Sequence, residues 1–248
     1  MNIPSLCVKD IRQLFADEYL AGNFVQDKSG VKLLELIGYS FVADENTIFG
    51  APNKEYIERE INWYKSLSLN VNDIAPPVPK IWQDVSSKNG EINSNYGWCI
   101  WSDEYQNYEG RHNYGQYWAV YKELLNNPDS RRAVMIYNRP TMHKDYNRDG
   151  MNEFMCTNSA QYFIRDDEMI AVVQMRSNDM HFGFRNDFAW QRHVVKLLGA
   201  CFGIHKTKII WHVGSLHIYE RSFYLVDHFV KTGEVHITKD DYKELYGE

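Results

Sequence analysis

The stretch FGFRNDFAWQ, residues 182–191, places a carboxylate among aromatic side chains. Asp187 lies between Phe184 and Phe188, and aromatic residues at this density usually belong to a protein interior. A carboxylate in an interior costs free energy unless a partner or a chemical task requires it. Asp187 is therefore the first candidate for a functional residue.

A second group of candidates flanks a predicted hairpin. Cys156 stands before its first strand, in EFMCTNSAQYF, where a cysteine is either a packing residue, the commoner role, or a nucleophile. Arg176, Ser177, Asn178 and Asp179 directly follow the apolar run AVVQM of the second strand. Polar residues clustered at the end of an apolar strand are typical of ligand sites, so this cluster predicts recognition of a polar ligand.

Two further pairs of residues could bind ligand groups. Arg131 and Arg132 enter the apolar stretch AVMIY, and neighbouring side chains of a strand point to opposite faces. Guanidinium groups match phosphate oxygens, so this pair either binds an anion or is a solvated pair at the start of a strand. His217 and Tyr219 are two residues apart and share one strand face. His217 is either a ligand-binding residue or a hydrogen-bonded core histidine.

Other motifs indicate no function. DYNRDG, residues 145–150, matches the start of an EF-hand calcium loop, but the glutamate required at its twelfth position is Cys156. We interpret this segment as a polar turn. The remaining cysteines, Cys7, Cys99 and Cys201, form no CxxC pair and no zinc-binding spacing with histidine. We expect no metal and no disulfide framework.

The composition limits the class of protein. The chain has 248 residues and a net charge of −6, with a pI of about 5.9. This acidic balance argues against direct nucleic-acid binding, which normally requires a basic excess. The sequence shows no signal peptide and no apolar run of about 20 residues, the length of a membrane span. We expect one domain, residues 1–248, in a cytoplasmic protein without membrane contact.

Helices and strands alternate along the sequence without a strict βαβ rhythm, which favours an α+β fold with one large sheet. Asn53 is positioned to cap the second of the predicted helices, with Ile57, Ile61 and Tyr64 on one face. The Pro-rich stretch 73–82 is expected to be a rigid loop. Helices are predicted at 8–20, 53–67, 115–126, 188–198 and 222–231, strands at 30–43 and 131–138, a hairpin at 159–175 and a pair of strands at 208–219.

Four segments taken in order resemble the thymidylate synthase family: DSRRAVMIYNRP, FMCTN, RSNDMHFGFRNDFA and GSLHIY. The resemblance runs from about Lys28 to Asp227, and the ordered set is far more specific than any one segment. It implies an α+β fold with a large mixed sheet and a homodimer packed through the sheets. It also implies transfer of a one-carbon unit from 5,10-methylenetetrahydrofolate to C5 of a pyrimidine deoxynucleotide.

The resemblance assigns catalytic roles to three residues. Cys156 matches the nucleophile that attacks C6 of the pyrimidine, which makes C5 electron-rich and divides one difficult step into easier ones. Nearby arginines would favour its thiolate form. Glu60, in EREINWY, matches the carboxylate that orders water and relays protons, although its helix alone would suggest an exposed charge. Tyr96, in SNYGW, matches the tyrosine implicated in removing the C5 proton.

The resemblance also implies contacts to the phosphate and the sugar. Arg176 and Ser177 match phosphate ligands, and Arg176 also matches the arginine beside the nucleophile. Lys28 stands where the family usually has a phosphate-binding arginine. Its ammonium group can bind phosphate as a point charge, but without the paired N–H groups of a guanidinium. Arg131 and Arg132 match a pair of arginines that reaches the phosphate bound by the partner subunit. His217 and Tyr219 match the pair that holds the 3′-hydroxyl of the sugar.

Folate-side contacts are implied at Trp82, Asp179 and Gly183, with Trp82 offering a ring face to the pterin. Asp179 matches a substrate-side contact as well. Two features depart from the usual family pattern. Asn178 stands where a cysteine is common, and the C-terminal DDYKELYGE does not match the tail that closes over folate.

Asp187 falls on the asparagine with which the family reads uracil, because Gly183 and Ala189 fix the register. Uracil presents an N3–H donor and an O4 acceptor, which a neutral amide complements. Cytosine presents the reverse pattern, which a carboxyl group sharing a proton with N3 complements. Burial should raise the pKa of Asp187 and help it hold that proton. A shift of register by one residue would place Asn186 there and restore uracil binding.

The resemblance is strongest to a bacteriophage branch of the family, in which water attacks the transferred carbon and dCMP becomes 5-hydroxymethyl-dCMP in the host cytoplasm. Two alternatives stay open. The enzyme could act on dUMP, as a hydroxymethylase or a thymidylate synthase, or the fold could have lost catalysis and only bind a nucleotide or a protein. Asp187 argues against the first alternative, and retention of Cys156, Glu60 and Arg176 argues against the second.

Overall fold

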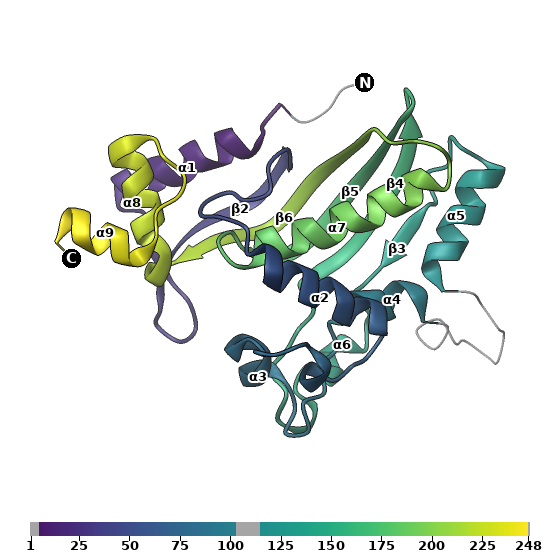
Figure 1. The fold of residues 1–248 in the computed structure, drawn as a ribbon, viewed down its shortest axis with the longest axis horizontal. Helices are drawn as coiled ribbons and strands as arrows, with labels where there is room; N and C mark the ends of the chain where they lie inside the picture. Colours follow the sequence, from purple (N-terminus) through teal and green to yellow (C-terminus); the bar gives the residue numbers. More distant parts are fainter. Residues whose placement is uncertain (1–4, 103–114, 248) are drawn as a thin grey trace. The chain divides into compact units, whose positions relative to one another are not determined.

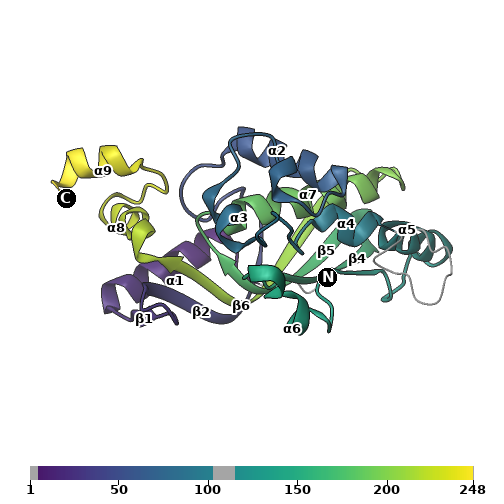
Figure 2. The same cartoon turned by 90° about the horizontal axis from the view of Figure 1, so that it is seen from below.

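The computed structural model describes residues 5–102 and 115–247 (Figures 1 and 2). The described strands are hydrogen-bonded in the order β1-β2-β6-β5-β4-β3, which confirms the α+β class and the single large sheet. The chain divides into two compact units, and the boundaries between them fall after Pro52 and within β5, α7 and β6.

Unit 1 takes in the chain through Pro52, then Met175–His193, and then the chain from Lys208 onwards. Its elements are α1 (Val8–Ala21), β1 (Val25–Gln26), β2 (Lys32–Val42), the end of β5 (Glu168–Asp179), the start of α7 (Gly183–Ala200), β6 (Thr207–Tyr219), the 3₁₀ turn η4 (Glu220–Ser222), α8 (Phe223–Thr232) and α9 (Lys239–Tyr246).

The core of unit 1 forms where β2 and β6 pair in antiparallel register and carry apolar side chains inward. Phe41 of β2 and Trp211 of β6 both pack against Phe184 of α7, with ring centroids 6.0 and 5.3 Å away. All three side chains are fully buried. Aromatic burial of this kind supplies much of the stability of a small core and fixes α7 on the strands.

Residues 208–219 form one long strand, so the predicted pair of strands is wrong. Gly214, in the middle of this strand, serves a close approach of two backbones. A Cβ atom at Gly214 would lie 2.7 Å from the backbone oxygen of Arg176. Glycine is therefore required here by packing and not by a turn.

The sequence pattern predicts no helix or strand at the C-terminal end of unit 1, where the structure has the helix α9. Its Tyr242 hydroxyl donates to Asp227 of α8 at 2.5 Å, and Lys231 of α8 pairs with the same carboxylate at 2.5 Å. Thr238 caps the helix by accepting from the backbone N–H of Asp241. These contacts hold α9 against α8, and both helices lie near the C-terminus in Figure 1.

Unit 2 comprises Asn53–Gln174 and Val194–Thr207. Its elements are α2 (Lys54–Ser66), the 3₁₀ turn η1 (Val71–Asp73), α3 (Lys80–Val85), α4 (Tyr96–Trp101), α5 (Gln116–Asn126), β3 (Val134–Ile136), α6 (Met142–Asp145), the 3₁₀ turn η3 (Arg148–Gly150), β4 (Thr157–Arg165), the start of β5 and the end of α7. Figure 2 shows α2 and α4 beside one another, in agreement with their packing.

Helix α2 begins where the sequence predicted it. Asn53 caps the helix, because its Oδ1 accepts a hydrogen bond from the backbone N–H of Tyr56 at 3.1 Å. The buried face differs from the predicted one: it carries Tyr56, Glu60, Trp63 and Tyr64, whereas Ile57 and Ile61 are half-buried. The aromatic side chains of α2 therefore lie in the core of unit 2, and the carboxylate of Glu60 is buried on the same face.

Strand β3 is shorter than predicted and begins at Val134, so Arg131 and Arg132 precede it. Both arginines are exposed, and the prediction that they lie within the strand is wrong. The predicted hairpin is confirmed in β4 and β5. Its turn residues Asp166 and Asp167 have φ values of 52° and 57°, as a two-residue turn of this hand requires.

Candidate active site

Asp187 lies on α7, which begins at Gly183, five residues before the predicted start. Its aromatic neighbours Phe184 and Phe188 are buried and stacked, with centroids 5.6 Å apart and planes at 11°. Asp187 itself is half-buried. Helical geometry therefore turns its carboxylate away from the line of the two rings, which the sequence had suggested would enclose it.

The side-chain amide of Asn178 holds this carboxylate. Asn178 Nδ2 donates to Asp187 Oδ2 at 2.7 Å, from the end of β5 to the second turn of α7. Asn178 is only 2% exposed. A Cβ atom at Gly183 would lie 3.1 Å from Asn178 Nδ2 and 3.6 Å from Asp187 Oδ2, so the glycine leaves the space that this pair occupies.

Asp179 uses both of its carboxylate oxygens. Oδ1 accepts from the backbone N–H groups of His181 and Phe182 at 2.9 and 3.2 Å, and Oδ2 accepts from Arg221 at 3.0 Å. Arg221 also lies over the ring of Tyr219, 4.5 Å from its centroid. The carboxylate thereby fixes the turn between β5 and α7 and joins it to the end of β6.

The expected phosphate-binding residues of unit 1 come from separate elements. Arg176 and Ser177 lie on β5, exposed and half-buried respectively. Lys28 is exposed in the turn between β1 and β2, which Asp27 orders by accepting from the backbone N–H groups of Ser29 and Val31. Each cation is accessible, as binding an anion requires.

His217 belongs to a chain of polar side chains across β2 and β6. The hydroxyl of Ser215 donates to the carboxylate of Glu35, and its oxygen lies 3.3 Å from Nδ1 of His217. Burial lowers the pKa of His217, and Asp179 opposes that effect. The imidazole is therefore neutral at pH 7 and has a defined partner on Nδ1. Its ring packs edge-on against Tyr219 at 5.0 Å.

Cys156 directly precedes β4 in unit 2, where its side chain is half-buried and forms no disulfide. Its Sγ lies 3.9 Å from the backbone oxygen of Phe154. Cys99 differs, because it is fully buried and burial raises its thiol pKa far above the ordinary value. A nucleophile must be accessible, and of these two cysteines only Cys156 is partly exposed.

Glu60 is 4% exposed, so it is not the surface charge that its helix alone suggested. The hydroxyl of Tyr56 donates to Glu60 Oε1 at 2.6 Å, and the indole N–H of Trp82 donates to the Tyr56 hydroxyl at 2.7 Å and approaches Glu60 at 3.3 Å. Burial and then Glu60 raise the pKa of Tyr56 far above its ordinary value. Tyr56 therefore stays protonated and donates to the carboxylate.

Tyr96 begins α4 and is buried in a column of rings. It stacks on Tyr64 with centroids 5.2 Å apart and meets Tyr137 edge-on at 5.3 Å. Asn95 caps α4 by accepting from the backbone N–H of Trp98 at 2.8 Å. The position of Tyr96 is therefore fixed by packing against α2 and by the helix cap.

Arg132 is held on its own chain by Glu123 of α5, at 3.0 Å. The hydroxyl of Ser130 donates to the same carboxylate at 2.5 Å, and Ser130 and then Arg132 lower the pKa of Glu123. Arg131 supplies its backbone oxygen to the side-chain amide of Gln161 at 2.8 Å. The two guanidinium groups are exposed, so both are accessible to an anion.

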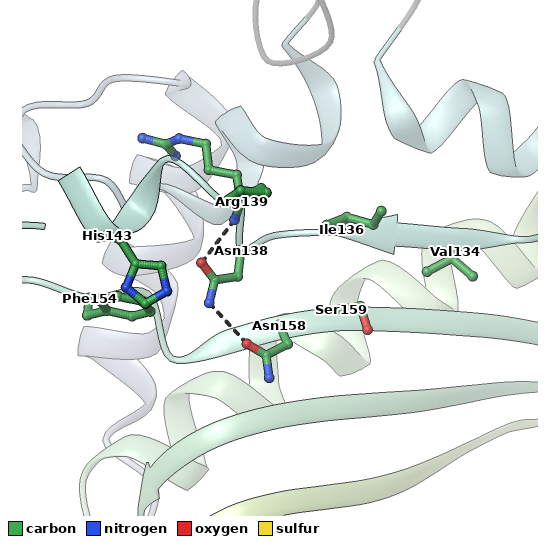
Figure 3. Close-up of a pocket in the computed structure, with 9 residues that line it drawn as sticks. Val134, Ile136, Asn138, Arg139, His143, Phe154, Asn158 and Ser159 are labelled. Carbon is green, nitrogen blue, oxygen red and sulfur yellow. Dashed lines mark hydrogen bonds between the residues drawn. The ribbon is translucent and has the colours of Figure 1, made fainter. Parts of the chain in front are cut away.

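A cavity of about 460 Å³ lies beside β3 within unit 2. Figure 3 shows Asn138 between Arg139 and Asn158, to which its side chain donates at 3.1 Å. The lining residues are Val134, Ile136, Asn138, Arg139, Pro140, His143, Phe154, Asn158 and Ser159. None of them was assigned a role from the sequence, although most lie in the segments DSRRAVMIYNRP and FMCTN.

Within unit 1, Asp187 and Gly183 lie beside Asn178, and Asp179 contacts Arg221. Within unit 2, Glu60 lies beside Trp82. Asn186 follows Arg185 on α7 and is half-buried. No sequence motif indicates the supporting residues Tyr56, Glu35, Ser215 and Arg221. Of these, Tyr56 is detectable, because it lies four residues before Glu60 and shares its helix face.

Two further properties bear on the type of site. Among residues 5–102 and 115–247 there is no group of three or more His, Cys, Asp or Glu side chains that could hold a metal ion. The described helices also include none long and apolar enough to cross a membrane.

Comparison with known proteins gives full-length relatives. The deoxycytidylate 5-hydroxymethyltransferases of Enterobacteria phages T6 and T4 are each 56% identical to this chain. The alignments cover 98% of this chain and 98% of the T6 protein, and 99% of this chain and all of the T4 protein. These relatives are transferases by name, which confirms the prediction of an enzyme.

More distant matches are thymidylate synthases. That of Fusobacterium nucleatum is 27% identical over 75% of this chain and 66% of its own length. The structure of a thermostable thymidylate synthase A from Bacillus subtilis superposes with a TM-score of 0.68 at 18% identity, covering 91% of this chain and 84% of that one, and so shows the fold. The family model described as thymidylate synthase matches residues 22–240. The chain therefore belongs to the thymidylate synthase family.

Proposed function

We propose that this enzyme transfers a one-carbon unit from 5,10-methylenetetrahydrofolate to C5 of dCMP and adds water, giving 5-hydroxymethyl-dCMP. Support comes from the phage relatives at 56% identity that are named for this substrate and group. The observation that carries the proposal is Asp187, a carboxylate that aligns with the asparagine with which the family reads uracil.

The base preference follows from hydrogen-bond polarity. Cytosine offers an acceptor at N3 and a donor at N4, so it needs a donor and an acceptor side by side. Asp187 provides both when it shares one proton with N3. Uracil offers the opposite pattern and would leave groups in the site unpaired, which can discriminate strongly. Withdrawing electrons from the ring through N3 also favours addition of a thiolate at C6.

Cys156 is the proposed nucleophile. Its sulfur forms a bond to C6, and the electron pair of the C5–C6 double bond becomes available to C5, which then bonds to the one-carbon unit. Loss of the C5 proton and release of the folate leave an exocyclic methylene, to which water adds. Breaking the bond between sulfur and C6 then regenerates the thiol.

Proton movements are assigned to the buried residues of unit 2. Glu60 orders water and relays protons, while Tyr56 and Trp82 hold its Oε1 in place. A positioned general acid or base contributes about 10²- to 10⁴-fold to a rate. Tyr96 is the residue proposed to remove the C5 proton. The ring of Trp82 is proposed to contact the pterin with its face, because the indole N–H already donates to Tyr56. Asp179 and Gly183 are the other proposed folate-side positions.

The remaining residues are assigned to the nucleotide. Arg176, Ser177 and Lys28 bind the phosphate, and His217 with Tyr219 binds the 3′-hydroxyl. Asn186 lies next to the base reader. In the proposed homodimer, Arg131 and Arg132 reach the phosphate held by the partner subunit, where guanidinium forks match phosphate oxygens.

Release of tritium from C5-labelled dCMP and dUMP, each with 5,10-methylenetetrahydrofolate, tests the substrate. Faster release from dCMP is expected, and mass spectrometry should identify the product as 5-hydroxymethyl-dCMP. Faster release from dUMP, or a methyl instead of a hydroxymethyl product, would show that the enzyme is another member of the family.

A further inference from the structure

We propose that Asn178 is a positioning residue that makes the two oxygens of Asp187 unequal and thereby biases the site against uracil. The inference rests on the proposed function, in which Asp187 reads the base. In that scheme Asn178 does not itself face the substrate. It stands where the family commonly has cysteine.

The geometry of the pair defines which atom donates. A carboxylate oxygen accepts hydrogen bonds, so the amide nitrogen of Asn178, and not its oxygen, faces Asp187 Oδ2 at 2.7 Å. Asn178 is 2% exposed, so water does not compete freely for this bond. Asn178 Oδ1 is buried and has no hydrogen-bond partner in the structure. The amide is thus oriented by the carboxylate alone.

This contact restricts where the shared proton can be. A carboxyl oxygen that carries a proton accepts hydrogen bonds more weakly than an unprotonated one, so donation from Asn178 disfavours a proton on Oδ2. The proton therefore prefers Oδ1, which donates to N3 of cytosine. Oδ2 keeps a second lone pair, and that lone pair accepts from the N4 amino group of the base.

The same restriction explains the rejection of uracil. A carboxyl group free to carry its proton on Oδ2 would donate to O4 and accept from N3–H through Oδ1, and would therefore match uracil as well as cytosine. Donation from Asn178 disfavours that arrangement, because a protonated Oδ2 accepts from the amide more weakly. Asp187 supplies the chemistry that cytosine requires, and Asn178 weakens the alternative that uracil would use.

Two substitutions test this. Asn178→Ala removes the donor, so the ratio of kcat/KM for dCMP to that for dUMP should fall about 10- to 100-fold, the range expected for a hydrogen bond to a charged group. Asn23→Ala is the matched control, because Asn23 makes an exposed bond of 2.8 Å to the carboxylate of Glu18. The control should leave the ratio unchanged.

An exchange of the two side chains provides a sharper test with almost no change in volume. In Asn178→Asp/Asp187→Asn, residue 178 can only accept, so the amide nitrogen of residue 187 turns toward it. That nitrogen then faces O4 and the amide oxygen faces N3–H, which is the uracil pattern. In Asp187→Asn alone, Asn178 accommodates either amide orientation. The exchanged enzyme should therefore prefer dUMP at least about 10-fold more than Asp187→Asn does.

The outcomes separate this inference from the proposed function. Wild-type preference for dUMP would overturn the proposed function. Wild-type preference for dCMP, together with an exchanged enzyme no more selective for dUMP than Asp187→Asn, would overturn the role of Asn178. Thermal unfolding of every variant reports folding. If Asn178→Ala does not fold, the exchanged pair still decides, because its altered base preference cannot arise from a purely structural role.

Discussion

Glu35 on β2 lies directly opposite His217 on β6, and the hydroxyl of Ser215 connects their side chains. Because the serine donates to the carboxylate, its oxygen accepts from Nδ1–H of His217. The neutral imidazole then presents Nε2 as an acceptor. An acceptor at this position suits a sugar hydroxyl, which can donate, and disfavours a 3′-phosphate, which cannot.

Removing the connecting hydroxyl should therefore weaken recognition of the 3′-hydroxyl. We expect Ser215→Ala to lower kcat/KM for dCMP by about 10-fold, since a hydrogen bond of this kind is worth about 1 kcal/mol or slightly more. The same change should have little effect on 2′,3′-dideoxy-CMP, which lacks the hydroxyl. Ser68→Ala is the matched control, because Ser68 bonds a carboxylate, Asp73, in unit 2. Equal losses on both nucleotides would refute the assignment.

Tyr56→Phe should reduce kcat more than it raises KM, because it removes a hydrogen bond that positions the carboxylate proposed to relay protons. The expected loss in kcat is about 10-fold, with Trp82 still able to approach Glu60. Steady-state kinetics with dCMP measures both constants. Tyr242→Phe removes a comparable tyrosine–carboxylate bond, to Asp227, and should leave the kinetics unchanged. A pure KM effect in Tyr56→Phe would contradict the positioning role.

Cys156→Ser should abolish turnover while leaving binding of dCMP within a few-fold of wild type. A serine hydroxyl stays protonated at pH 7 and is a far weaker nucleophile than a thiolate. Tritium release measures turnover, and isothermal titration calorimetry measures binding. Cys201→Ser, at an exposed cysteine, serves as the control and should remain active. Retention of turnover in Cys156→Ser would exclude the covalent route.

These residues show what could be predicted from sequence alone. Asn53 as a helix cap and the turn at Asp166 and Asp167 are local signals, and both are confirmed. Asp187 was detected because an acid among aromatic residues conflicts with its surroundings. Such a conflict within a few residues can be read without a structure.

The supporting residues could not be predicted in the same way, because their partners are distant in the chain. The pairing of Glu35 with His217 depends on the register of two strands whose residues are 182 positions apart. Gly214 lies inside a long strand, and only the nearness of the Arg176 backbone shows why it is glycine. Packing between elements therefore decides what local patterns leave open.

Gly97 illustrates a site where that packing can be tested. A Cβ atom there would overlap the backbone oxygen of Tyr64, which cannot move without disturbing α2. Gly97→Ala should therefore destabilise the protein by about 3 kcal/mol or more, beyond a typical substitution. Urea unfolding measures the change. Gly233→Ala is the control, because its positive φ of 78° gives backbone strain of about 1 kcal/mol in open space. Equal effects would contradict the close approach.

The stability of the fold should depend on pH through His181. Burial, and then Arg185, lower the pKa of this imidazole to about 4, and its Nδ1 lies 2.9 Å from the hydroxyl of Ser222. An unfolded histidine has a pKa of about 6.5. Between these values the unfolded chain binds a proton that the folded chain does not, so stability rises with pH. Lowering the pH from 7 to 4 should cost about 3 kcal/mol from this residue.

His181→Gln removes the titrating group and keeps a polar side chain next to Ser222. Its free energy of unfolding in urea should fall less between pH 7 and pH 4.5 than that of the wild type. His217 contributes in the same direction, because burial lowers its pKa too, so His217→Gln is the appropriate comparison. Carboxylates that titrate below pH 5 affect all three proteins alike and cancel in the difference. An unchanged pH dependence in His181→Gln would mean that the folded protein protonates His181 as readily as the unfolded chain does.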